Sequence, residues 1–93
     1  MTVKHVDGTN DKKSVFLYAL STCPWCKKTK TLLDELKVKY DYLYVDLVVG
    51  QEQEEILAQI EVYNPGGGFP TLVIDKAEVI IGYKPEAIKE ALA

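Results

Sequence analysis

The chain has two cysteines, and both lie in the stretch STCPWCKK at residues 21–28. Two thiols at this spacing can hold a metal, anchor a haem, form a structural disulfide or act as a redox couple. A structural zinc site needs about four ligands, and besides these thiols the chain has one histidine, His5. A c-type haem anchor needs a histidine directly after the second cysteine, where Lys27 stands. The sequence therefore predicts no metal site and no haem at this pair.

A structural disulfide between Cys23 and Cys26 would contribute little to stability. The loop that it closes is so short that closing it removes little conformational entropy from the unfolded chain. Two inert buried thiols would have apolar neighbours, whereas this pair follows a Ser-Thr dipeptide and precedes two lysines. A redox couple is the interpretation that remains.

The predicted elements around the motif fit this chemistry. Residues 14–20 form a short apolar run, which is typical of a strand buried on both faces. Helical spacing follows, and one stripe of the helix contains Trp25, Thr29, Leu32, Leu33 and Leu36. Pro24 suits the first turn of a helix, where a missing N–H costs nothing. A helix is therefore predicted to begin at the motif, with Cys23 at its N-terminal edge.

Cys23 is the predicted nucleophile because of this position. Unpaired N–H groups and the positive end of the helix dipole stabilise a thiolate there. Lys27 can add to this effect, although a solvated side chain is the simpler interpretation of that lysine taken alone. Cys26 lies one turn inside the helix and is predicted to resolve the mixed disulfide. Pro24 limits the backbone between them and raises the helical order of the reduced motif.

The rest of the chain supplies the other elements of one small α/β domain. Helices are predicted at residues 51–60 and 86–92, and strands at 40–49, 71–74 and 78–81, the last two as an antiparallel hairpin. Residues 1–13 are polar and are predicted as a flexible N-terminal arm, with a short edge strand at its start as the alternative. The order βαβαββα predicts a four-stranded mixed sheet flanked by three helices, in a single domain of residues 14–93.

Charge and hydropathy exclude several kinds of partner. The net charge of −3 gives no case for binding nucleic acid or an anionic membrane surface. No apolar run approaches the roughly 18 residues of a membrane-spanning helix, and the N-terminus lacks the apolar core and cleavage site of a secretory signal. We therefore expect a cytoplasmic monomer, and in that compartment a CxxC pair is more often catalytic or metal-binding than a persistent disulfide.

Phe69-Pro70-Thr71, directly before the predicted strand at 71–74, is the second candidate element. A proline there cannot donate a hydrogen bond to a sheet and is a candidate for a cis peptide bond, although the sequence alone does not decide this. The glycines at 66–68 lack the Gly-Lys-Ser/Thr of a phosphate loop and are interpreted as a flexible approach to Pro70. Trp25 has two interpretations: it opens the apolar stripe, or it presents its ring to a partner.

The chain resembles the glutaredoxin branch of the thioredoxin superfamily over nearly its full length. The resemblance is carried by VFLYALSTCPWCKKTKTLLDELKVKYDYLYVDL, then FPTLVI, then EVIIGYKPEAIKEAL. It implies a thioredoxin-like fold, a cis Pro70 beside Cys23, and reversible reduction of disulfides. It also implies that Phe69, Pro70 and Thr71 offer backbone groups to an extended substrate, in the manner of an added strand.

Two segments depart from the glutaredoxins that use glutathione. Those proteins usually carry a lysine or arginine shortly before the motif, where residues 20–22 read LST. They also tend to have Gly-Gly-x-Asp-Asp near the last helix, where residues 82–86 read GYKPE. The latter segment is similar to the NrdH-type redoxins, which behave as thioredoxins and supply electrons to ribonucleotide reductase. Trp25 is closer to the thioredoxin motif than to the common glutaredoxin tyrosine, so the resemblance implies a reductase of protein disulfides.

The resemblance implies a cycle with no bound cofactor. Cys23 attacks the target disulfide, Cys26 releases the reduced target, and a thioredoxin reductase-like or ferredoxin-linked disulfide reductase restores the thiols. One alternative is a glutathione-dependent glutaredoxin, and another is a dimer that bridges an iron–sulfur cluster. Pro24 counts against the cluster, because cluster-bridging members more often have serine or glycine there. A redox-inactive adaptor is disfavoured because both cysteines are present.

Overall fold

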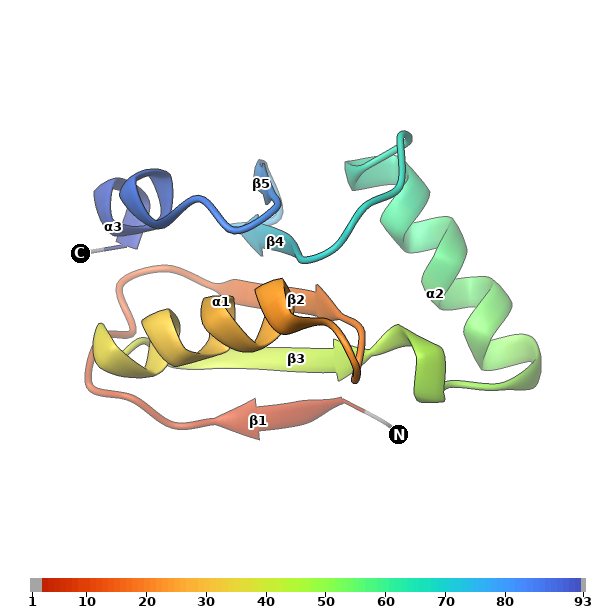
Figure 1. Cartoon of the computed structure of the whole chain (residues 1–93), viewed down its shortest axis with the longest axis horizontal. Coiled ribbons are helices and arrows are strands. Elements are labelled where there is room, and N and C mark those ends of the chain that lie inside the picture. The colour runs from red at the N-terminus through yellow and green to blue at the C-terminus, as the bar shows by residue number, and fades with distance from the viewer. Residues whose placement is uncertain (1–2, 93) are drawn as a thin grey trace.

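The computed structural model describes residues 3–92 of the 93-residue chain, so residues 1–2 of the predicted arm and residue 93 of the predicted domain lie outside it. In this part of the chain no helix is long and apolar enough to cross a membrane. The elements in chain order are β1 (Lys4–Val6), β2 (Val15–Ala19), α1 (Pro24–Glu35), β3 (Tyr40–Tyr44), the 3-10 helix η1 (Val45–Leu47), α2 (Gly50–Tyr63), β4 (Thr71–Ile74), β5 (Glu78–Ile81) and α3 (Pro85–Leu92) (Figure 1).

The strands form one sheet in the order β1-β3-β2-β4-β5. β3 runs parallel to β2, as the predicted crossover requires, and β4 and β5 form the predicted antiparallel hairpin. β2 and β4 lie side by side inside the sheet, and their sequences VFLYA and TLVI are apolar because layers of helix cover both faces. The thioredoxin-like arrangement predicted from the sequence is thereby confirmed.

The predicted number of four strands was wrong, because a fifth strand lies in the segment predicted as an arm. β1 pairs antiparallel with β3, with Lys4 opposite Tyr42 and Val6 opposite Tyr40. Its three residues include two exposed polar side chains, so its sequence carries almost no strand signal. Gly8 follows it at a close approach, where a Cβ atom would lie 2.3 Å from the Lys37 carbonyl oxygen. This glycine is the one feature of the segment that marks it as packed.

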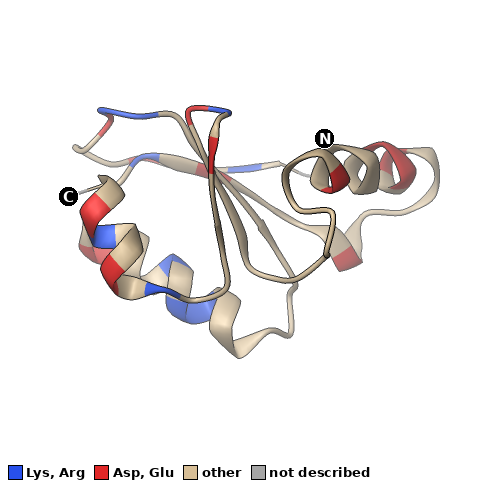
Figure 2. Ribbon diagram, turned by 90° about the horizontal axis from the view of Figure 1, so that it is seen from above, with Lys and Arg blue, Asp and Glu red and all other residues tan. Residues whose placement is uncertain are grey.

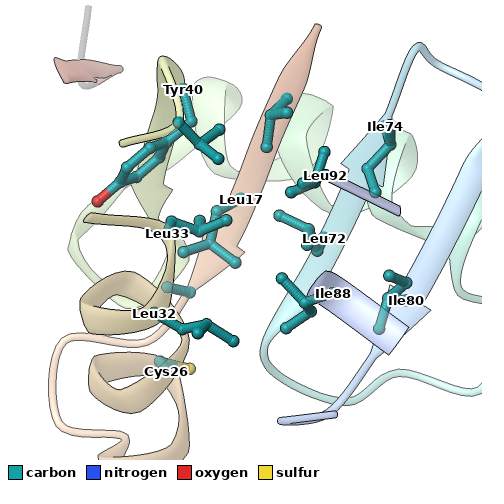
Figure 3. Packing of buried hydrophobic residues seen from close by; sticks show 13 residues of the cluster. Leu17, Cys26, Leu32, Leu33, Tyr40, Leu72, Ile74, Ile80, Ile88 and Leu92 are labelled. Atoms are coloured by element: carbon teal, nitrogen blue, oxygen red, sulfur yellow. The ribbon is translucent and has the colours of Figure 1, made fainter. Parts of the chain in front are cut away.

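Two layers of helix cover the sheet, α1 and α3 on one face and α2 on the other (Figures 1 and 2). Alternation along the central strands assigns each side chain to a face, so Leu17 packs under α1 while Tyr18 packs toward α2. Figure 3 shows the cluster on the α1 and α3 face, with Cys26 at its edge beside Leu32. Cys26, the second cysteine of the motif, is therefore anchored in the larger core of the domain.

Two boundaries differ from the sequence prediction. β3 ends at Tyr44, and the chain then turns through η1, which buries Val45 and Val48 and leaves Leu47 exposed. Residues 45–49 read VDLVV and remain mostly apolar, so residue type alone does not separate a strand from this turn. α2 continues to Tyr63, beyond the predicted end at residue 60, and in it Ile60 is buried, whereas the exposed fraction of Leu57 is 48% because it lies around the helix from the buried stripe.

Candidate active site

The motif lies between the end of strand β2 and the first turn of α1. Cys23 is the N-cap residue of α1, with extended backbone angles of φ −87° and ψ 115°, and Pro24 is the first helical residue. The Cys26 backbone N–H donates a hydrogen bond to Cys23 Sγ at 3.2 Å, which satisfies one of the free amides of the first turn. The Lys27 N–H donates to the Cys23 carbonyl oxygen at 3.1 Å and begins the helical ladder. The predicted start of the helix is confirmed.

The two sulfur atoms have different surroundings. Both cysteines are free thiols, Cys23 partly exposed and Cys26 with an exposed fraction of 1%. Burial raises the pKa of Cys26 to about 12, and its hydrogen bond with Cys23 adds to the rise. Cys26 therefore stays protonated at neutral pH, while Cys23 is the sulfur that a second molecule can reach.

A carboxylate that sequence reasoning missed fixes the residues before the motif. The Ser21 backbone N–H donates to Asp46 Oδ1 at 2.9 Å, and the Ser21 hydroxyl donates to Asp46 Oδ2. These two bonds, the hydroxyl first, hold the pKa of Asp46 below its ordinary value. A signal was present in the parallel pairing, because Ala19 lies opposite Tyr44, and Ser21 and Asp46 each follow two residues later.

The segment Phe69-Pro70-Thr71 reaches the same end of the sheet. Its Phe69–Pro70 bond is cis, so the cis expectation is confirmed. Thr71 is fully buried and pairs with Tyr18, the fourth residue of the strand that leads to the motif. Phe69 and Cys23 both pack against the cluster beneath α1. The structure thus brings the second predicted element to the site of the first.

Side-chain and backbone hydrogen bonds hold this segment in place. Asn64 is buried at the C-terminal end of α2, and its Nδ2 donates to the Gly68 carbonyl oxygen and to Thr71 Oγ1, both at 3.0 Å. Thr71 Oγ1 in turn donates to the Gly68 carbonyl oxygen at 2.7 Å. The Pro70 carbonyl oxygen accepts a hydrogen bond from the Gly82 N–H at 2.9 Å. Asn64 was assigned to a helix-breaking run from the sequence, and its supporting position was not predicted.

Trp25 lies outside the buried stripe of α1, so the first of its two interpretations, that it opens this stripe, was wrong. Its ring is 54% exposed and stacks on Tyr83 with centroids 5.9 Å apart and an interplanar angle of 25°. Lys28 Nζ lies 4.6 Å from the centroid of the indole. Lys27, predicted to support the site, is exposed beside them, and the hydrogen bond to Cys23 Sγ comes from the Cys26 backbone. Tyr83 is a further residue that the sequence did not assign to the site.

The part of the chain that the structure describes holds no group of three or more His, Cys, Asp or Glu side chains placed to bind a metal ion. The arrangement instead offers one reachable sulfur at a helix N-terminus, a second protonated sulfur one turn behind it, and an ordered backbone segment alongside. These groups can form and break a disulfide in sequence with a bound partner.

Comparison with known proteins matches this chain to glutaredoxins. Residues 15–79 match the family model described as glutaredoxin. The structure is similar to that of a glutaredoxin from Methanosarcina mazei Go1, with a TM-score of 0.89 and 44% identity, covering 100% of this chain and 89% of that one. It is also similar to Methanosarcina acetivorans methanoredoxin, with a TM-score of 0.85 and 41% identity over 89% of this chain and 87% of that one.

A curated relative matches over a shorter stretch. Glutaredoxin 1 from Rickettsia felis is 36% identical over 44 residues, which is 47% of this chain. The match spans less than half of that relative, 43% of its length.

Proposed function

Because the chain belongs to the glutaredoxin family of the thioredoxin superfamily, whose members are thiol–disulfide oxidoreductases, we propose that it reduces protein disulfides through both cysteines. The observation that carries this proposal is the contrast between the two sulfurs. Cys23 is reachable and accepts an amide hydrogen bond that stabilises negative charge, while burial keeps Cys26 protonated. A nucleophile and a reserved second thiol are the two parts that a dithiol reaction needs.

The reaction begins with the thiolate of Cys23. Its sulfur attacks one sulfur of the target disulfide, a mixed disulfide forms, and the other target sulfur leaves as a thiolate that takes up a proton. Cys26 then loses its proton to solvent and attacks Cys23 Sγ, the bond between Cys23 Sγ and the target breaks, and the second target sulfur leaves as a thiolate that takes up a proton from solvent. Two electrons have passed to the target, whose disulfide is now two thiols, and the Cys23–Cys26 pair is a disulfide.

The segment before β4 positions the target chain in this proposal. The Pro70 carbonyl oxygen already accepts a bond from Gly82, and Thr71 lies within the ladder between β2 and β5. Phe69 precedes the strand and, like Cys23, packs against the cluster beneath α1. We therefore assign the main backbone contact with an extended substrate to Phe69, with Pro70 and Thr71 holding its place.

The test is the reduction of insulin disulfides with dithiothreitol as the electron source. Wild-type protein is expected to turn over, Cys23→Ser to be inactive, and Cys26→Ser to stall as a mixed disulfide that is visible by mass spectrometry. Iodoacetamide at neutral pH is expected to modify Cys23 in the native protein and Cys26 only after unfolding. Full activity of Cys23→Ser would contradict the assignment of the nucleophile.

We further propose that the protein is a thioredoxin-like electron donor, with ribonucleotide reductase as one target. The support is the segment GYKPE at residues 82–86, together with Trp25 in the motif. The donor is tested by comparing a flavin-linked disulfide reductase, a ferredoxin-linked one and glutathione in the same assay. Faster turnover with a reductase than with glutathione is expected, and the reverse order would favour a glutathione-dependent glutaredoxin.

A further inference from the structure

An open groove of about 360 Å³ lies between α1 and the segment that joins β5 to α3. It is lined by Lys27, Lys28, Thr31, Leu32, Glu35 and Tyr83. Trp25 stacks on Tyr83 at the end of the groove nearest Cys23, since Trp25 lies in the first turn of α1. The groove therefore leads away from the reactive sulfur along one side of the helix.

The aromatic pair at the near end of the groove leaves much of a large apolar ring exposed to solvent. Trp25 is 54% exposed, and Lys28 Nζ lies over its indole at 4.6 Å from the centroid. Stacking on Tyr83 fixes the orientation of the ring, so its free area is presented at little cost in side-chain entropy. Exposed tryptophan and tyrosine held in this way are typical of residues that dominate binding to another protein.

The α1 side of this pair is positively charged, whereas the chain as a whole is negative. The net charge is −3, yet the first turn of α1 contains no acidic residue and is followed by Lys27 and Lys28. On the other side, the exposed Lys84 follows Tyr83 in the chain, and Glu86 stands in the first turn of α3. Glu35 is the acid of the groove and lies at the end far from Trp25. Figure 2 shows the lysines of α1 gathered apart from the acidic residues of α2.

The length of the groove selects a peptide rather than a small thiol. The groove follows α1 from Lys27 to Glu35, which is about 12 Å of helix at 1.5 Å per residue. An extended chain of about four residues covers this distance. Because Lys27 and Lys28 line the groove near Trp25, they favour an occupant with acidic side chains there.

We propose that Trp25, Tyr83, Lys28 and Lys84 form a docking surface for an acidic, extended segment of the protein whose disulfide Cys23 reduces. The proposal rests on the proposed function and adds the chemistry of the partner to it. The aromatic pair supplies contact area, and the lysines select partners that carry aspartate or glutamate beside the target disulfide.

The test uses three disulfide-bonded peptides that are identical except for the residues beside the disulfide, which are acidic, neutral or basic. The wild type is expected to prefer the acidic over the neutral peptide in kcat/KM, and to lose that preference at high salt. Lys28→Glu is expected to lower the acidic-to-neutral ratio by roughly fivefold, through KM rather than kcat, and to favour the basic peptide. Trp25→Ala is expected to raise KM for the acidic peptide.

Lys12→Glu, an exposed lysine in the segment before β2, is the matched control and is expected to keep the wild-type ratio. Equal reduction of all three peptides by the wild type would overturn the docking surface and leave the disulfide reductase intact, whereas failure to reduce any of them would overturn both. If Lys28→Glu weakens the reduction of oxidised glutathione as much as that of the acidic peptide, the groove takes a small anion and the proposal is wrong.

Discussion

On the face of the sheet covered by α1 and α3, thirteen buried residues of the described chain pack into one cluster that includes Cys26, whereas the cluster on the α2 face has six. Among the described residues, α2 supplies one fully buried side chain, Ile60, to that smaller cluster, packs the partly buried Ile56 and Tyr63 against it, and leaves Leu57 and Val62 exposed. Apolar burial therefore fixes α1 and α3 on the first face. On the second face, α2 buries fewer apolar side chains against the sheet.

The two faces support the candidate site in correspondingly different ways. Cys26 is fixed and kept protonated by the apolar packing beneath α1. On the other side, Asp46 in η1 fixes Ser21, and Asn64 at the end of α2 fixes Gly68 and Thr71, in both cases by hydrogen bonds. The resolving thiol thus depends on burial, and the backbone around the nucleophile depends on polar contacts. The two parts of the site are expected to respond to different perturbations.

The largest expected effect comes from a cavity under α1. Leu33 is fully buried between the helix and the sheet, so Leu33→Ala is expected to lower the free energy of unfolding by about 2–5 kcal/mol. Urea denaturation of the reduced protein measures this loss. The matched control on the other face is Leu57→Ala, which removes a half-exposed side chain and is expected to cost less than about 1 kcal/mol. Equal losses in the two variants would remove the contrast between the faces.

The next effect comes from the polar support on the α2 side. Asn64→Ala removes the amide donor to Thr71 Oγ1 and one of the two side-chain donors to the Gly68 carbonyl oxygen, which keeps its bond from Thr71 Oγ1, and is expected to cost about 1–3 kcal/mol. It is also expected to lower kcat/KM for peptide disulfides, because the Phe69–Thr71 segment loses its support.

Asn10→Ala is the control for this variant. Asn10 Nδ2 donates to the Leu92 carbonyl oxygen, far from the motif in the sequence and on the edge of the domain. A loss of stability without a loss of turnover is expected there. If both asparagine variants lowered turnover equally at a temperature where both are folded, Asn64 would have no special part in the site.

A smaller effect reports on the burial of Cys26. The ordinary pKa of cysteine is 9.0, and burial raises that of Cys26 to about 12, so between these values the unfolded chain has lost a proton that the folded chain retains. The stability that the folded protein gains by keeping Cys26 protonated is fully present below pH 9 and is lost as the pH rises toward 12. Cys26→Ser lacks it, so stability is expected to fall less steeply with pH than in the reduced wild type. Tyr40, whose pKa burial also raises, is the same in both proteins and cancels.

Parallel pH profiles of the urea midpoint for the two proteins would show that Cys26 titrates as it does in the unfolded chain. In that case the apolar face would not protect the resolving thiol.

The parts of the fold that rest on apolar periodicity were predictable from the sequence. The continuous runs of β2 and β4 and the stripe of α1 each bury one or two faces, and such patterns specify an element without its neighbours. The N-cap position of Cys23 followed from Pro24 and the start of that stripe. The face with the larger cluster was therefore the face that the sequence described best.

The polar parts of the site were not predictable in the same way. Asp46 lies in an apolar run that was predicted as a strand, and Asn64 lies at the start of a helix-breaking run, and each acquires its role from a residue in another element, Ser21 and Thr71 respectively. A short edge strand at the start of the arm was only the alternative interpretation for a related reason, because the sheet edge with which β1 pairs exists only after β3 has formed. Such contacts follow from strand register, which a single sequence indicates only weakly.

The smallest expected effect concerns the contact between Ser21 and Asp46, which is exposed to solvent. Hydrogen bonds from Ser21 lower the pKa of Asp46 from 3.8, so the folded protein keeps this charge to lower pH than the unfolded chain does. The resulting stability is present above pH 3.8 and is lost as pH falls through the folded value. Ser21→Ala removes the hydroxyl donor, so its deficit against the wild type is expected to be full at neutral pH and to shrink in acid. Thermal unfolding from neutral pH to strong acid measures it, with Thr22→Ala as the exposed neighbour that should show no such change. A deficit independent of pH would mean that the carboxylate of Asp46 does not hold the backbone before Cys23, and that the apolar face alone orders the motif.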